Sequence, residues 1–174
     1  DKEEQLTGAQ KGTLIHLCMQ KLDEKKDYDL QKIRDLISSL KEKEIITHKE
    51  AENINAFKVL EFTKSNIWRD LKEAEEVYKE KPFYINIPVN EIYEGTPKLQ
   101  EGILVQGIID LYYIDKNGNI ILVDYKTDYV QDEKELTQKY KEQLNLYKDA
   151  IEKALNKKVY KTLIYSTCLQ KEIV

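Results

Sequence analysis

The chain has 174 residues, of which 41% are hydrophobic and 34% are charged, and its formal net charge at pH 7 is −4. This composition is that of a folded globular protein and excludes a disordered one. The negative balance argues mildly against a nucleic-acid binder without excluding one, because phosphate affinity rests on Lys and Arg. No apolar run approaches the ~20 residues of a membrane span, so we expect a cytoplasmic protein with no membrane partner.

Two further features limit the class of protein. The chain begins at Asp1 rather than Met, so we expect a fragment or a processed chain. It contains only two cysteines, Cys18 and Cys168. Two thiolates cannot supply a four-cysteine iron–sulfur or zinc site, and a lysine-rich chain of cytosolic character keeps its thiols reduced. We therefore expect no iron–sulfur cluster.

The first 80 residues have a helical pattern. Apolar residues recur at helical spacing over residues 14–22 and 30–40. Thr47 followed by Glu50 forms a capping-box signature, which predicts a helix over residues 47–62. A further helix is predicted over residues 64–79, and Pro82 is expected to end the helical region.

The pattern changes after residue 82. Alternating and apolar runs predict strands over residues 83–89, 102–114 and 119–127, a long helix over 133–155 and a last strand over 158–167. Helices followed by three strands, a helix and a strand indicate an α/β or α+β fold. We expect one domain over residues 1–174, mostly helical over 1–80 and with the sheet in 81–174.

Charged residues end an apolar strand in the segment IILVDYKTDYV, residues 120–130. A buried charge is costly unless it is paired, so the placement needs a reason. Asp124 and Lys126 are two residues apart and share one face of the strand. Together with Asp110 and the Tyr125 carbonyl, they offer the hard oxygen donors that Mg²⁺ prefers and a cation that can stabilise developing negative charge.

The turn between the two strands decides whether Asp110 and Asp124 share a face. A two-residue loop at Asn117–Gly118 would send the two side chains to opposite faces, because side chains alternate along a strand. A shared site requires a bulge or a loop with an odd number of residues. A three-residue loop, Lys116–Gly118 with Gly118 left-handed, meets this requirement, and we predict it.

Three segments in order, GIID (107–110), VDYKTD (123–128) and QLNLY (143–147), resemble the RecB-type branch of the PD-(D/E)xK nucleases. The resemblance implies a restriction-endonuclease-like core, with a mixed β-sheet flanked by helices. It implies an active site made of Asp110, Asp124, Lys126, Gln143 and Tyr147. Gln143 and Tyr147 lie on one helical face and are implied to orient the site and contact DNA. The alternative is that Tyr147 is a core residue with Gln143 at its edge.

An upstream segment, GTLIH (12–16), matches the G-x-x-x-H that the same branch carries. The match implies that His16 is a metal ligand with Asp110, Asp124 and the Tyr125 carbonyl, for Mg²⁺ or for Mn²⁺ in its place. The alternative is a histidine satisfied within its own helix. Glu80 resembles a glutamate that precedes the first core strand of relatives and is a further candidate for the site.

More narrowly, the chain resembles the C-terminal nuclease domains of AddA-type helicase–nuclease proteins. This implies a Mg²⁺-dependent exonuclease that hydrolyses single-stranded DNA ends in double-strand-break repair and recombination. No G-x-x-x-x-G-K-[ST] phosphate loop is present, so the helicase motor would lie on a preceding part of the polypeptide, and an AddB-like subunit would be the partner.

Two alternatives stay open at this point. One is a catalytically inactive DNA-binding or docking domain of the same fold. The other is a stand-alone Cas4-like or phage-type exonuclease. The shortage of cysteines disfavours the Cas4-like case, because those relatives typically bind an iron–sulfur cluster.

Overall fold

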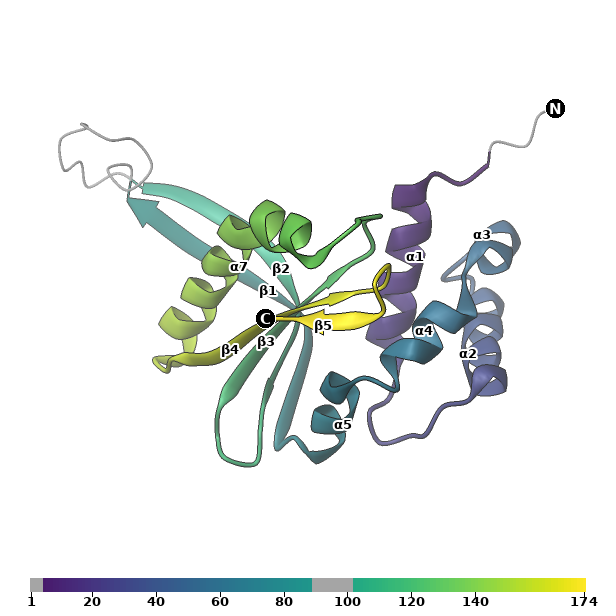
Figure 1. Cartoon of the computed structure of the whole chain (residues 1–174), viewed down its shortest axis with the longest axis horizontal. Helices are drawn as coiled ribbons and strands as arrows, with labels where there is room; N and C mark the ends of the chain where they lie inside the picture. Colours follow the sequence, from purple (N-terminus) through teal and green to yellow (C-terminus); the bar gives the residue numbers. More distant parts are fainter. Residues whose placement is uncertain (1–4, 89–101) are drawn as a thin grey trace.

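The computed structural model describes residues 5–88 and 102–174 (Figure 1). The N-terminal elements are α1 (Gly8–Lys21), α2 (Leu30–Glu42), α3 (His48–Asn53), α4 (Ala56–Phe62) and α5 (Asn66–Glu73). The remaining elements are β1 (Glu76–Pro88), β2 (Gly102–Ile114), β3 (Ile120–Lys126), α7 (Glu133–Leu155), β4 (Val159–Ser166) and β5 (Lys171–Ile173). The predicted mixed α/β class is confirmed.

The strands form one mixed sheet in the order β1-β2-β3-β4-β5. Neighbouring strands are antiparallel except β3 and β4, which are parallel. Parallel neighbours need a crossover connection, and α7, predicted at its observed bounds, supplies it. No helix in the described ranges is long and apolar enough to cross a membrane.

Helices cover both faces of the sheet. Helices α1–α5 lie to one side of it and α7 packs on the other face (Figure 1). On the α1–α5 side, Phe62 packs edge-on against Tyr125 and Tyr165, with ring centroids 5.2 and 4.9 Å apart. On the α7 side, Ile151 packs in a cluster with Leu122. Strand β3 is therefore buried on both faces, which accounts for its unbroken apolar run.

The helix predicted over residues 64–79 is wrong beyond residue 73. Helix α5 ends at Glu73, and Tyr78 lies in β1, stacked on Tyr112 of β2 with centroids 4.6 Å apart. Pro82 is also inside β1, paired in register with Ile108, so it does not end a helical region. Strand β1 stands at the end of the strand order, and an edge strand tolerates a residue without an N–H group.

Two other element predictions need correction. The capping box of Thr47 and Glu50 is present, but the helix predicted over 47–62 is two helices, because the Asn55 side chain caps α4. The predicted last strand is followed by the short strand β5, which no sequence pattern had indicated. The strand predicted over 83–89 is part of β1, and its last residue lies outside the described residues.

The hairpin between β2 and β3 has the predicted three-residue loop. The N–H of Asp115 donates to the carbonyl of Asn119 at 3.0 Å, which encloses residues 116–118, and Gly118 has a φ of 76°. The register pairs Leu111 with Val123. The same register, continued by one residue, brings positions 110 and 124 opposite each other.

Gly12 allows α1 to lie close to the segment that follows β3. A Cβ atom added at Gly12 would stand 2.2 Å from the Oγ1 atom of Thr127 and 3.1 Å from its Cβ atom. A methyl group at position 12 fits only if the Thr127 side chain rotates away and its Cβ atom shifts by a few tenths of an ångström. The glycine therefore sets the position of α1 against the end of β3.

We expect Gly12→Ala to destabilise the chain relative to Gly8→Ala by about 1–2 kcal/mol in urea unfolding. Overpacking costs about 1–3 kcal/mol, which exceeds the ~1 kcal/mol that Ala gains over Gly in a helix. Gly8 is the control because a Cβ atom there meets nothing within 4 Å. Adding Thr127→Ala should recover part of the loss. Equal stability of the two alanine variants would contradict the close approach.

Candidate active site

Two aspartates from neighbouring strands lie close to one backbone segment. The Asp124 side chain is on β3 and its residue is only 2% exposed. Asp110 on β2 accepts a hydrogen bond at its Oδ2 atom from the backbone N–H of Tyr125, at 2.8 Å. The register of β2 and β3 brings positions 110 and 124 opposite each other, and the charge of Asp110 raises the pKa of Asp124, so the two carboxyl groups lie close together next to the end of β3.

An irregularity in β1 and β2 occurs beside Asp110. Glu80 has a left-handed backbone, with a φ of 51°, and is absent from the otherwise continuous register between Lys79 and Lys81. On β2, Ile109 and Tyr112 pack in the same α7-side cluster although they are three residues apart, so strict alternation fails between them. Left-handed backbone outside glycine is costly and is often found at functional sites.

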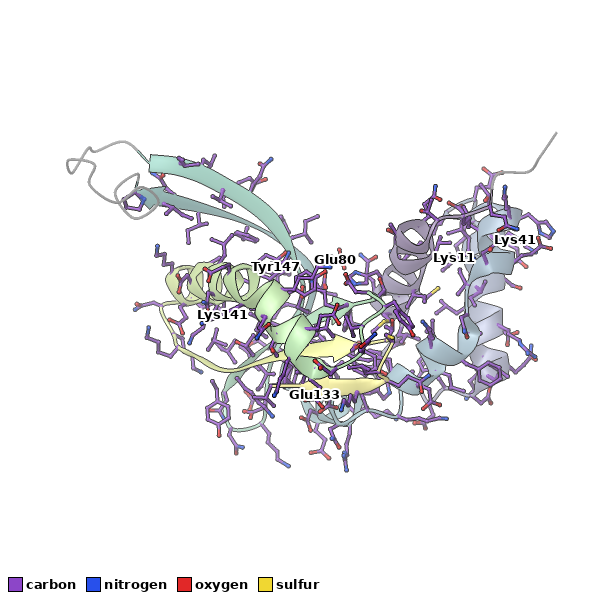
Figure 2. All side chains as sticks on the ribbon, turned by 45° about the horizontal axis from the view of Figure 1, so that its top comes forward. Lys11, Lys41, Glu80, Glu133, Lys141 and Tyr147 are labelled. Atoms are coloured by element: carbon purple, nitrogen blue, oxygen red, sulfur yellow. The ribbon has the colours of Figure 1, made fainter. Side chains whose placement is uncertain are left out.

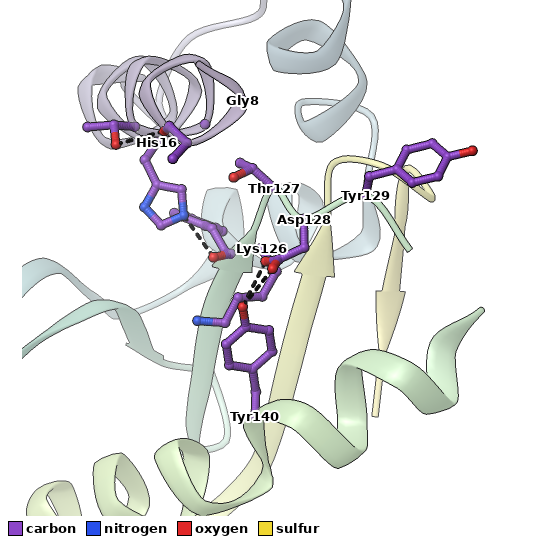
Figure 3. Close-up of a pocket in the computed structure, with 11 residues that line it drawn as sticks. Gly8, His16, Lys126, Thr127, Asp128, Tyr129 and Tyr140 are labelled. Atoms are coloured by element: carbon purple, nitrogen blue, oxygen red, sulfur yellow. Dashed lines mark hydrogen bonds between the residues drawn. The ribbon is translucent and has the colours of Figure 1, made fainter. Parts of the chain in front are cut away.

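His16 reaches the end of β3 from α1. Its Nε2 atom lies 2.7 Å from the carbonyl oxygen of Tyr125 (Figure 3). Its Nδ1 atom lies 3.8 Å from Oδ1 of Asp110. His16 follows Gly12 by one helical turn. The G-x-x-x-H spacing thus has a physical reason: the glycine lets the helix approach, and the histidine one turn later meets the strand.

Lys126 is enclosed by three groups. Its Nζ atom lies 2.7 Å from Oδ2 of Asp124, donates to Oε1 of Gln143 at 2.7 Å, and stands 3.9 Å from the ring centroid of Tyr140. The Lys126 side chain is 12% exposed. Two of the three groups, Gln143 and Tyr140, come from α7, so packing of α7 on the sheet determines where the ammonium group lies.

Tyr147 has both a packing role and a polar contact. Its hydroxyl accepts a hydrogen bond from Nε2 of Gln143 at 2.9 Å, while its ring packs edge-on against Phe83 with centroids 5.3 Å apart. Glu80 lies three residues before Phe83 on β1, in the region where β1 and α7 meet (Figure 2). Tyr147 is therefore a core residue that also holds Gln143 toward Lys126.

The two aspartates are incompletely neutralised. Burial raises the pKa of Asp124 to about 6; the charge of Asp110 adds to the rise and the ammonium of Lys126 opposes it. Burial also raises the pKa of Asp110, where nearby His16 and the Tyr125 N–H act in the opposite direction. Oδ2 of Asp124 is buried, and its close contact with the Lys126 ammonium, 2.7 Å away, lowers the pKa of this carboxyl group against the effect of burial.

These donors suit a hard divalent cation. Asp110, Asp124 and the Tyr125 carbonyl offer the oxygen ligands that such ions prefer, and a cation would offset the buried negative charge. Within residues 5–88 and 102–174, no three His, Cys, Asp or Glu side chains are grouped closely enough to hold an ion by themselves. A bound ion would therefore need the backbone carbonyl and solvent ligands as well. The free thiols Cys18 and Cys168 are not part of this donor set.

A cleft of about 610 Å³ opens next to these residues (Figure 3). The first half of α1 forms one wall, and the segment after β3 together with Tyr140 forms the other. Its lining includes His16, Tyr125 and Lys126. No motif in the sequence had indicated Tyr140 as a site residue. Its position three residues before Gln143, on the same helical face, was the available signal.

The chain belongs to the PD-(D/E)XK nuclease superfamily, whose sequence model matches residues 1–171. It is similar to the A-type subunits of ATP-dependent helicase/nucleases. That of Clostridium novyi (strain NT) is 39% identical over 178 residues, which cover 99% of the chain and 14% of the relative. That of Thermoanaerobacter sp. (strain X514) is 40% identical over 169 residues, covering 95% and 14%. The chain thus spans a small part of these relatives.

We expect Asp124→Asn to stabilise the metal-free protein at neutral pH. Folding raises the pKa of Asp124, so the protonated carboxyl group favours folding and its ionisation opposes folding. The stability that the protonated group contributes is fully present below the ordinary pKa near 4 and is lost as pH rises through about 6. Wild type and variant should unfold alike near pH 4 and differ by about 1–3 kcal/mol above pH 7. Urea unfolding in EDTA across this range measures the difference.

The exposed Asp149 provides the matched control for this experiment. Asp149→Asn removes the same charge from the surface of α7 and should show no such pH-dependent gain. A difference between wild type and Asp124→Asn that stays constant from pH 4 to pH 8 would contradict the raised pKa.

Proposed function

We propose that this chain is a divalent-metal-dependent deoxyribonuclease that hydrolyses phosphodiester bonds from DNA ends. The observation that supports this most is the buried Asp124 carboxylate, which lies against the Lys126 ammonium and on the same side of the hairpin as Asp110. Burial raises the pKa of both carboxyl groups, and the Lys126 ammonium opposes the rise. A buried group with a raised pKa beside a specific charge partner is a functional-site candidate.

The proposed ion-binding residues are His16, Asp110, Asp124 and the Tyr125 carbonyl. Mg²⁺ is the proposed ion, with Mn²⁺ able to replace it. When bound, the ion would supply Lewis-acid stabilisation for the charge that develops on the phosphate. Nε2 of His16 would exchange its present contact with the Tyr125 carbonyl for this role.

The remaining residues would position the reacting groups. We propose that Lys126 donates a hydrogen bond from Nζ to the attacking water or to a phosphate oxygen, which orients the water and balances charge. Gln143 would hold the ammonium in place, and the Tyr147 hydroxyl would hold the Gln143 amide. In this proposal Gln143 and Tyr147 also contact the DNA strand where it passes α7.

We further propose that the chain is the nuclease part of a longer polypeptide. Relatives that carry its counterpart over 14% of their length are named helicase/nuclease subunits. A helicase region of the same polypeptide would deliver single-stranded ends to the cleft, and an AddB-like subunit would complete the complex in double-strand-break repair and recombination.

We expect the chain to degrade end-labelled linear single-stranded DNA with Mg²⁺ or Mn²⁺ and not in EDTA. Asp124→Ala and Lys126→Ala should each lower the rate by at least about 10²-fold, the usual effect of removing a group that stabilises the transition state. Both variants should keep a cooperative urea transition, because neither Asp124 nor Lys126 belongs to the apolar clusters that join the helices to the sheet. Circular single-stranded DNA should resist cleavage if the chain acts from ends.

The controls for this experiment are Asp149→Ala and Lys171→Ala, which remove exposed charges outside the site. Both should cleave at the wild-type rate. Metal-independent DNA binding by a wild type that cleaves nothing would contradict the proposal and favour a docking domain. Full activity in Asp124→Ala would contradict the assignment of the site.

A further inference from the structure

The Lys126 ammonium lies over an aromatic ring that the proposed function does not use. Its Nζ atom stands 3.9 Å from the ring centroid of Tyr140 on α7 (Figure 3). A cation within about 6 Å of a ring centroid is attracted by the ring's electron-rich face. The attraction is larger where water is excluded, and the Lys126 side chain is only 12% exposed.

Tyr140 is itself fixed to the segment that follows β3. Its hydroxyl donates to the carboxylate of Asp128, with contacts of 2.9 Å to Oδ1 and 2.8 Å to Oδ2. The Nζ atom of Lys139 lies 2.6 Å from Oδ1 of the same carboxylate. The ring is therefore tied at its hydroxyl end to a residue only two positions beyond Lys126 (Figure 3).

The contacts of Tyr140 with Asp128 and Lys126 join the end of β3 to α7. Lys126 and Asp128 lie two residues apart at the end of β3. Asp128 binds the hydroxyl of Tyr140 on α7, and the ring of Tyr140 contacts the Lys126 ammonium, so the contacts form a closed loop. A lysine side chain has a long flexible stem with many accessible rotamers. A ring fixed 3.9 Å from the ammonium, in addition to its polar partners Asp124 and Gln143, limits that freedom.

We propose that Tyr140, anchored by Asp128, is a positioning residue that holds the Lys126 ammonium against Asp124 and Gln143. The inference rests on the proposed function. Tyr140 acts on the reaction through the face of its ring, and Asp128 acts through the Tyr140 hydroxyl. The half-buried Tyr140 packs against the apolar cluster that contains Leu136 and Ile164 and also lines the cleft, so its ring can act at the site from a fixed position.

The decisive experiment varies the electron density of the ring at nearly constant shape. Position 140 is changed from Tyr to Phe and then to phenylalanines with one, two and three ring fluorines, and single-stranded DNA cleavage is measured. Fluorine withdraws electron density and weakens the attraction of the ring for a cation. We expect kcat to fall stepwise along the series while KM stays constant, because a misplaced ammonium group affects the chemical step.

Natural substitutions set the size of the effect. Tyr140→Leu should lower kcat roughly 5–30-fold, the equivalent of a cation–π contact at a desolvated site. Tyr140→Phe should recover most of that loss, and the small remainder measures the anchor to Asp128. Tyr160→Leu is the matched control, since Tyr160 is 71% exposed near the start of β4, at the opposite end of that strand from the site.

A second measurement does not depend on activity. The ring of Tyr140 should shift the NMR signals of the Lys126 Cε protons upfield in the wild type, and Tyr140→Leu should abolish that shift while Tyr160→Leu keeps it. A flat kcat across the fluorinated series, or unshifted Lys126 signals in the wild type, would overturn the inference. An upfield shift in a protein that cleaves no DNA would overturn the proposed function and leave the contact itself demonstrated.

Discussion

The structure of this site depends on the burial of Asp124 beside Lys126 at the end of a strand that is covered on both faces. Apolar packing by helices on either side of β3 removes water from this end of the sheet, and this desolvation raises the pKa of Asp124. A single ammonium group does not compensate two neighbouring carboxyl groups there. The local excess of negative charge is the feature that suits the site to a divalent cation.

Two backbone features bring the other groups to that strand end. Gly12 lets α1 approach the segment after β3, so His16 reaches the Tyr125 carbonyl one helical turn later. The left-handed residue Glu80 interrupts the β1–β2 ladder beside Asp110. Neither feature contributes a large apolar contact. Both set the local backbone geometry at the place where groups from three elements meet.

Sequence patterns predicted the structure well where the chemistry is local. The three-residue loop with left-handed Gly118 followed from requiring Asp110 and Asp124 to share a face, and the structure has that loop. The helix 133–155 followed from a long, clean period. The prediction failed over residues 74–82, where a helical apolar spacing continued by chance into an edge strand. The role of Tyr140 was not predicted either, because an aromatic residue on a buried stripe looks like core until its polar neighbours are known.

By itself, the sequence determined which chemical groups are present, their order and the elements that carry most of them, because periodicity, capping and turn preferences are properties of short segments. Only the tertiary structure decided how far apart those groups lie. The contacts of Lys126 with Gln143 and Tyr140 join β3 to α7, and the contact of His16 with Tyr125 joins residues 109 positions apart. Such distances depend on how helices pack on a sheet, and that packing cannot be predicted from the pattern of a short segment.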